Sequence, residues 1–351
     1  LHPSAFIVPT CLACAERRNG IGGKELQELP VEESAGRIRV ILLLVLSVSM
    51  VSSASILIRF SVSPPLVIVF WRTLYGAIVM ATLGGIRGDL KEFKSGQVRA
   101  TWPWLVLIGI ILSLHFSTWF TSLFETTVAA SVVLVNTSPI FTAIISTVFL
   151  GESLRRKSWA GVLVAVAGAI LLAWDDMIAQ GLGALYGDML ALLSAFFLAL
   201  YFIGGRKYAR GIPITVYTTA IYLVAAVVTL AMGLGMGLDF LVLDPREIAI
   251  FVALAIFPTA LGHSVNNYLL TLVPAYVVSS AVLGEPIGAT LLAIAFLGSS
   301  EIPRPLAFGG FSIILIGIAL VLADIAGQER KQASALDNTD GAKSDSFGSD
   351  S

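Results

Sequence analysis

Two copies of one sequence stretch decide the fold: VNTSPIFTAIISTVFLGE at residues 135–152 and VLGEPIGATLLAIAFLG at residues 282–298. Both are apolar, both carry a proline near the start, and both contain Phe-Leu-Gly near the end. One constant offset along the chain matches Pro139 with Pro286. Apolar runs of this length are typical of helices in a lipid bilayer. The duplication therefore indicates two copies of one membrane unit.

The same offset relates residues far outside this stretch. Further matched pairs are Arg59 and Arg206, Tyr75 and Tyr222 and, after a two-residue insertion, Glu152 and Glu301, Gly161 and Gly310, and Gly168 and Gly317. A single register over so long a distance is hard to obtain by chance. It predicts an internal repeat that covers most of the chain.

Composition agrees with a protein that crosses the membrane many times. Of 351 residues, 56% are hydrophobic and 13% are charged, and the mean hydropathy is +0.88. An average soluble domain has about 25% charged residues. A spanning helix needs about 20 mostly apolar residues, and the sequence offers ten such spans, at residues 39–60, 65–86, 101–123, 128–150, 158–174, 184–205, 213–237, 247–270, 275–298 and 306–325.

Each copy of the repeat contains five spans, which is an odd number. The second copy therefore enters the membrane in the opposite sense to the first. Inverted repeats let two equivalent halves enclose a cavity whose access alternates between the two sides, as in secondary transporters. The sequence predicts an all-α integral membrane protein with ten transmembrane helices in two inverted five-helix repeats.

The repeated motifs also resemble a known family. NTSPIF at residues 136–141, FLGE at residues 149–152 and the following glycines resemble the end of an EamA domain, and the second half repeats them. The resemblance covers residues 38–325 and extends to the ten-helix drug/metabolite transporter superfamily. It implies EamA repeats at residues 38–174 and 175–326, a cavity lined by the first four spans of each, and export or exchange of a metabolite.

Basic residues predict the orientation in the membrane. Fourteen Lys and Arg residues flank the spans on the N-terminal side, against Arg59, Arg246 and Arg304 on the other. Cytoplasmic loops retain basic residues, so we expect both termini in the cytoplasm and the protein in the plasma or inner membrane. Residues 1–37 and 327–351 are expected to form disordered cytoplasmic tails.

Several other functions find no support in the sequence. The net charge of −1 gives no electrostatic case for nucleic-acid binding. Cys11 and Cys14 have no second pair, and we see no metal-ligand spacing, nucleotide-binding loop or hydrolytic triad. We expect no metal, no cofactor and no enzymatic activity. The expected partners are the lipid bilayer and a small solute, and a homodimer through the repeated glycines stays open.

A charge at membrane depth marks the second span. Arg72 lies about seven residues, or roughly 10 Å, from the outer end of its span, next to Trp71 and one turn before Tyr75. One interpretation is a cationic anchor for a carboxylate or phosphate, walled by the two aromatic rings. The other is an arginine that reaches to the surface or forms a structural ion pair. Both interpretations stay open.

An acid lies near the midplane of the ninth span. Glu285 precedes Pro286 there, and it could carry a proton in a coupled transport cycle. It could instead bond to backbone groups that the proline leaves free, and this structural interpretation is favoured. Since Pro139 and Pro286 occupy matched positions, both helices are expected to bend there.

Two polar stripes are expected to face a cavity or a partner helix. His115 and Trp119 share a face of the third span, and His263 and Asn267 share a face of the eighth. Hydrogen bonding between helices explains such stripes as well as substrate contact does. The predicted cavity residues are Arg72, Trp71, Tyr75, His115, Trp119, Asn136, Tyr201, Tyr222, His263, Asn266 and Asn267.

Together these features predict a secondary transporter of a small metabolite. With Arg72 as the one clear buried cation, an amino-acid-like or other small organic solute fits better than a multiply phosphorylated one. The alternative is proton-coupled multidrug efflux with Glu285 as the proton carrier. A third hypothesis, a membrane enzyme or scaffold that transports nothing, would need a catalytic cluster that the sequence does not show.

Overall fold

The computed structural model describes residues 31–150, 156–272, 278, 281–282, 284–299, 302–317, 319–320 and 323–324. The chain divides into a unit of residues 1–39 and a unit of residues 40–351. The second unit begins at Val40, within the first helix, α1 (Val31–Ser52), and it contains the later helices and the cavity. Every element within the described residues is helical. Of the predicted tails, residues 1–30, with Cys11 and Cys14, and residues 327–351 lie outside the described residues, as do Glu152 and Glu301. Residues 31–37, predicted as disordered tail, are helical.

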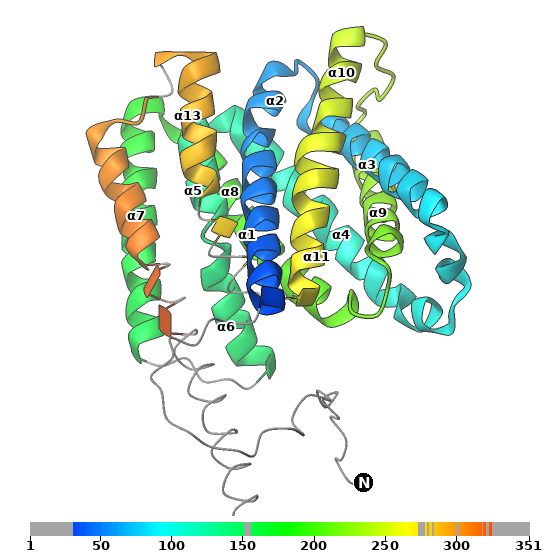
Figure 1. Cartoon of the computed structure of the whole chain (residues 1–351). Coiled ribbons are helices and arrows are strands. Elements are labelled where there is room, and N and C mark those ends of the chain that lie inside the picture. The colour runs from blue at the N-terminus through cyan, green and yellow to red at the C-terminus, as the bar shows by residue number, and fades with distance from the viewer. Residues whose placement is uncertain are drawn as a thin grey trace, which may run out of the picture. The chain divides into compact units, whose positions relative to one another are not determined.

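Figure 1 shows the helices in chain order. The first half of the chain contains α1 (Val31–Ser52), α2 (Ala54–Phe60), α3 (Pro65–Arg87), the 3-10 helix η1 (Asp89–Lys94), α4 (Gly96–Glu125), α5 (Val128–Val135), α6 (Ser138–Leu150) and α7 (Arg156–Gln180). The second half contains α8 (Leu182–Tyr208), α9 (Ile214–Gly235), α10 (Pro245–Leu254), the π-helix η2 (Ala255–His263), α11 (Ser264–Leu272), α13 (Glu285–Leu297) and a further helix at Pro305–Gly317.

Among the described residues, six segments are long and apolar enough to cross a membrane: Ile38–Phe60, Pro65–Arg87, Gly96–Glu125, Leu182–Tyr208, Ile214–Gly235 and Pro245–Leu272. Shorter apolar helices lie at Val128–Thr142, Trp159–Gly168, Glu285–Leu297 and Pro305–Gly317, where the fourth, fifth, ninth and tenth spans were predicted. The all-helical membrane architecture is thus confirmed. The count of ten spans stays a prediction.

Local sequence sets the helix ends. The third span begins at Gly96, five residues before the predicted start, because the Ser95 side chain accepts a hydrogen bond from the Val98 amide. Gly88 ends α3 in a left-handed conformation with φ of 76°, which glycine adopts without strain. Thr127 caps α5 by accepting from the Ala130 amide.

Three of the predicted spans are not continuous α-helices. The first is interrupted at Ser53 between α1 and α2, the fourth breaks at residues 136–137 into α5 and α6, and the eighth becomes the π-helix η2 between α10 and α11. In the second copy, α13 begins at Glu285. The offset of the repeat matches Glu285 with Ser138, where α6 begins. Both copies therefore start a helix at the same place, just before the matched prolines Pro139 and Pro286.

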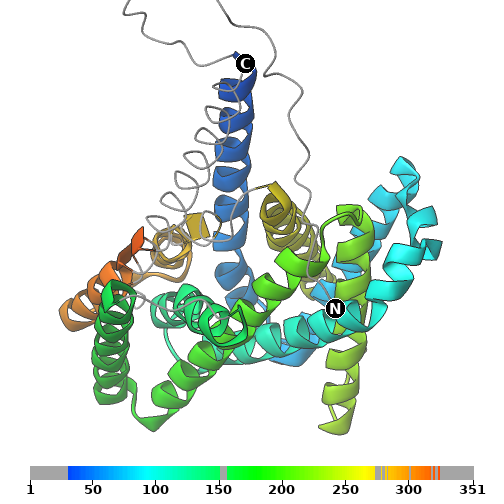
Figure 2. The same ribbon diagram turned by 90° about the horizontal axis from the view of Figure 1, so that it is seen from below.

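Helices from the two halves pack against each other. The closest pairings join α4 with α8 and α9, and α3 with α9, and α5 packs on α13. Figure 2 shows α4 and α8 crossing beneath the end of α1. Small residues allow these approaches: a Cβ added at Gly109 would lie 2.6 Å from Cβ of Val224. The centre of the second unit is thus an interface between the halves.

The glycines spaced seven residues apart bring α7 against the helix Pro305–Gly317. A Cβ added at Gly168 would lie 2.7 Å from the backbone nitrogen of Ile314, and one added at Gly317 would lie 2.6 Å from the carbonyl oxygen of Gly161. These glycines therefore serve close packing within the chain.

Candidate functional site

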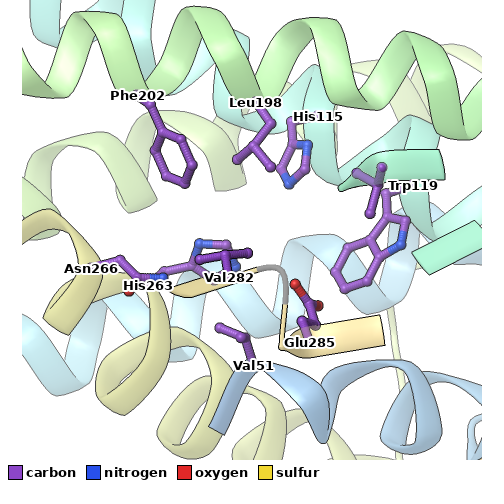
Figure 3. Close-up of a pocket in the computed structure, with 10 residues that line it drawn as sticks. Val51, His115, Trp119, Leu198, Phe202, His263, Asn266, Val282 and Glu285 are labelled. Atoms are coloured by element: carbon purple, nitrogen blue, oxygen red, sulfur yellow. The ribbon is translucent and has the colours of Figure 1, made fainter. Parts of the chain in front are cut away.

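A cavity lies where the two halves meet (Figure 3). The empty space in the cavity is at most about 350 Å³, and this volume includes the part that is open to the surroundings. The residues that line it are Val51, His115, Trp119, Val135, Leu198, Phe202, His263, Asn266, Val282 and Glu285.

Both halves of the chain contribute to the cavity. The first half supplies residues from α1, α4 and α5, and the second supplies residues from α8, η2, α11 and α13. Val135 and Val282 are matched by the offset of the repeat, so equivalent positions of the two copies face the same space. Four of the predicted cavity residues line it directly: His115, Trp119, His263 and Asn266. Glu285, predicted as a coupling or structural acid, lines it as well.

Glu285 supplies the carboxylate of the cavity. It is 7% exposed, and its side chain points into the cavity (Figure 3). Its Oε2 accepts a hydrogen bond of 3.3 Å from Nδ2 of Asn136, which also donates to the Val132 carbonyl. Asn136 lies at the break between α5 and α6. This bond therefore links the start of α6 with the start of α13, which are the two helix starts matched by the repeat.

The two histidines lie on one side of Glu285 and differ in their partners. His115 Nδ1 forms a hydrogen bond of 2.8 Å with the Ser194 hydroxyl, which fixes the ring against α8. The His115 ring stacks on Trp119 at 6.1 Å and lies 6.5 Å from the His263 ring. His263 Nδ1 has no hydrogen-bond partner among the described residues.

Several buried polar atoms around the cavity lack partners in the described part of the chain. They include Trp119 Nε1, Asn266 Oδ1 and Asn267 Oδ1. Asn267 uses its amide group to donate to the Tyr201 hydroxyl at 2.6 Å, a bond between α11 and α8. Buried polar groups in folded proteins are normally hydrogen-bonded. Unpaired donors and acceptors at a cavity are therefore available to water or a solute.

Arg72 is fully buried and lies behind the cavity wall. Its Nε donates to Thr259 Oγ1 at 2.7 Å, and its guanidinium carbon lies 4.2 Å from the Phe116 ring centre and 5.2 Å from that of Phe120. Phe116 in turn contacts the ring of His263. Arg72 does not reach the surface, and neither terminal guanidinium nitrogen has a hydrogen-bond partner among the described residues.

The aromatic residues predicted to wall Arg72 lie elsewhere. Trp71 donates to the Phe240 carbonyl at 3.1 Å, stacks on Phe251 and packs against Tyr75. Neither Trp71 nor Tyr75 lines the cavity. Tyr222 is buried close to Arg72, where its hydroxyl hydrogen-bonds Ser264 Oγ at 3.0 Å.

Sequence reasoning missed residues whose role depends on tertiary packing. Phe116 and Phe120 share a helix face with an i, i+4 spacing, and so do Leu198 and Phe202. Such spacing marks a common face but not the element it faces. Apolar cavity residues such as Val51 have no signal in a sequence that is apolar throughout.

Comparisons with other proteins agree with this architecture. The model of the EamA-like transporter family matches residues 38–174 and 185–323. A crystal structure with 19% sequence identity superposes with a TM-score of 0.60, over 81% of this chain and 97% of the other, and shares the fold.

Curated relatives are named as transporters. The uncharacterized transporter YwfM of Bacillus subtilis (strain 168) is 23% identical over 235 residues, 67% of this chain and 77% of the relative. The uncharacterized transporter YdfC of the same strain is 26% identical over 62% of this chain and 70% of its own length. A riboflavin transporter of Rhizobium johnstonii is 26% identical over 70% of this chain and 78% of its own length. With both repeats matched, the chain belongs to the EamA-like transporter family.

Proposed function

We propose that this EamA-family transporter moves a small organic solute by alternating access, for export or exchange, through ten spans in a plasma or inner membrane with both termini in the cytoplasm. The observation that carries the proposal is the position of the cavity between the two EamA repeats, with lining residues from both. Rocking of the halves would open this cavity to one side and then to the other.

The lining chemistry supports a solute that is small and carries no net charge. Glu285 supplies a negative charge, and Arg72, close enough to attract it, supplies a positive charge behind Phe116. A zwitterion or a neutral polar compound would leave these charges balanced, whereas a multiply charged solute would not. Riboflavin, named for one relative, is a further candidate because Trp119 and Phe202 offer aromatic surfaces.

A ligand screen by thermal unfolding tests the substrate class. Purified protein would be heated with amino acids, nucleotides, sugar phosphates, polyamines, riboflavin or lipophilic drugs. A compound that binds the folded state raises the melting temperature by mass action. We expect a shift with a neutral or zwitterionic metabolite, and its loss in Asn266→Ala, which removes a cavity amide whose oxygen has no partner among the described residues. Shifts with sugar phosphates alone would contradict the proposed substrate class.

Proton-coupled drug efflux is the second candidate, because Glu285 presents its carboxylate to the cavity. Under this alternative, Glu285→Gln would abolish both drug resistance in cells and the pH dependence of transport. If Glu285 is structural, Glu285→Gln keeps an oxygen for the Asn136 bond and preserves transport. Uptake measured at several pH values therefore separates the two roles.

A further inference from the structure

The start of α10 is tied to the loop between α2 and α3 by one buried carboxylate. Glu247 is 2% exposed, and its Oε2 accepts hydrogen bonds from the Ser61 and Ser63 hydroxyls, both at 2.5 Å. The Ser63 amide donates to the same oxygen at 3.2 Å, and the Val62 amide donates to Oε1 at 3.1 Å. We call residues 61–63 with Glu247 the Glu247 latch.

The latch joins the two repeats rather than two parts of one repeat. Residues 61–63 follow the first span, and Glu247 opens the eighth. Arg246 adds a further link by donating to the Phe60 carbonyl at 3.3 Å. Since the cavity lies between the repeats, they cannot separate at this end unless these bonds break.

The inverted repeat places an equivalent contact at the other end of the molecule. Its offset matches Ser63 with Arg210 and Gln97 with Asp244. Gln97, at the start of α4, donates through Nε2 to the Arg210 carbonyl at 3.1 Å. Again a loop before one helix meets the start of another helix from the other repeat.

The two contacts lie one membrane thickness apart. The 23-residue helix α3 runs from the loop of the latch towards η1 and α4, a length of roughly 35 Å. In Figure 1, α10 begins at the top of the view, and α4 begins at the lower right.

The contacts differ greatly in strength. The Glu247 latch is buried and holds a carboxylate with four donors, whereas the Gln97 contact is exposed and uses one neutral amide. Hydrogen bonds to a charged group are about twice as strong as neutral ones. At the Gln97 end, Thr215 Oγ1 also donates to Asp89 Oδ2 at 2.7 Å, so that end has a carboxylate as well, but with one donor where Glu247 has four. The described bonds between the repeats are therefore more numerous at the Glu247 end.

We propose that the Glu247 latch closes its own end of the transport path and makes the conformation open at the Gln97 end the resting state. The inference rests on the proposed alternating access. Weakening the latch shifts the population towards opening at the Glu247 end. Weakening the Gln97 contact moves the population in the opposite sense, and by less.

Distances between paired spin labels test this bias. Cys11 and Cys14 are first replaced by serine in the full chain. Val62→Cys with Leu243→Cys, whose native side chains are 80% and 76% exposed, reports separation at the Glu247 end. A second pair, Ala100→Cys with Arg206→Cys at exposed positions, reports separation at the Gln97 end.

Glu247→Gln should increase, by about tenfold or more, the population in which the Val62–Leu243 distance is long. The reason is that the amide nitrogen of the new Gln side chain cannot accept hydrogen bonds from the donors of the latch. The Ala100–Arg206 distance should shorten at the same time. The matched control is Asp239→Asn, an acid in the loop before α10 whose Oδ1 accepts a hydrogen bond from the Leu241 amide of the same loop. It should leave both distances unchanged.

Ser63→Ala removes one donor without touching the buried acid, and it should shift the same population less than Glu247→Gln. Unchanged distances in a folded Ser63→Ala protein, with Glu247→Gln either unchanged or unfolded, would overturn the proposal. Solute uptake by the wild-type protein in liposomes is measured separately. Absent uptake with a distance shift would count against the proposed function, and uptake without a shift would count against the latch.

Discussion

The neighbours of Arg72 compare the sequence prediction with the structure at a single residue. The sequence identified it as a buried cation but assigned it the wrong neighbours, because Trp71 and Tyr75 are close in sequence whereas Phe116, Phe120 and Thr259 are close in space. Residues that are neighbours along a helix can point to different faces of it, so adjacency in sequence does not predict which side chains surround a long one. The burial of Arg72 without an ion pair among the described residues favours a functional role, since an unpaired buried charge costs free energy.

Arg72→Met tests that role at constant side-chain volume. Because it removes a buried charge, we expect the apparent melting temperature to stay within about 4 °C of wild type or to rise, while solute-induced stabilisation is lost. Arg206→Met, at an exposed position matched to Arg59, is the control and should change neither quantity. A steep fall in melting temperature for Arg72→Met alone would make the arginine structural.

At the scale of the element, the sequence predicted helices better than their interruptions. Hydropathy located segments such as Ile38–Phe60 and Pro65–Arg87 closely. It did not reveal the π-helix η2, where Thr259 Oγ1 donates to the Leu254 carbonyl five residues earlier and the Ser264 hydroxyl donates to the Thr259 carbonyl. A serine or threonine that satisfies a displaced carbonyl has the same sequence signature as one in a regular helix.

Thr259→Val tests the importance of this interruption. Valine fills nearly the same volume but leaves the Leu254 carbonyl and Arg72 Nε without their hydroxyl partner. We expect a loss of about 1–3 kcal/mol of stability, seen as a lower melting temperature. Thr259→Ser keeps the hydroxyl and should stay closer to wild type. Equal effects of the two variants would mean that the methyl group, not the hydroxyl, is what matters.

At the scale of the whole molecule, the repeat was the most informative feature of the sequence. It matched Pro139 with Pro286, where bends within continuous spans were expected, and in the structure a helix begins one residue before each proline, at Ser138 and Glu285. It also placed Gly168 and Gly317 in equivalent helices but did not say what those helices contact. In the structure the glycines bring α7 against Pro305–Gly317. We propose that the predicted homodimer uses another surface.

Gly317→Ala tests this intramolecular packing. The added Cβ would lie 2.5 Å from the Ala165 backbone nitrogen, so the helices must move apart at a cost of about 1–3 kcal/mol. Gly183→Ala, where a Cβ meets nothing within 4 Å, is the control. We expect a lower melting temperature for Gly317→Ala alone and an unchanged oligomeric state by light scattering. Dissociation of a dimer in Gly317→Ala would instead place the glycines at a subunit interface.

Uptake of a radiolabelled solute into liposomes that contain the purified protein tests most directly whether the cavity between the repeats is a transport site. The solute would be the one that most raises the melting temperature. We predict uptake above that of empty liposomes, stimulated by the same unlabelled solute inside and lost in Asn266→Ala, whose native amide lines the cavity. Uptake unchanged by Asn266→Ala would contradict a binding site between the two halves.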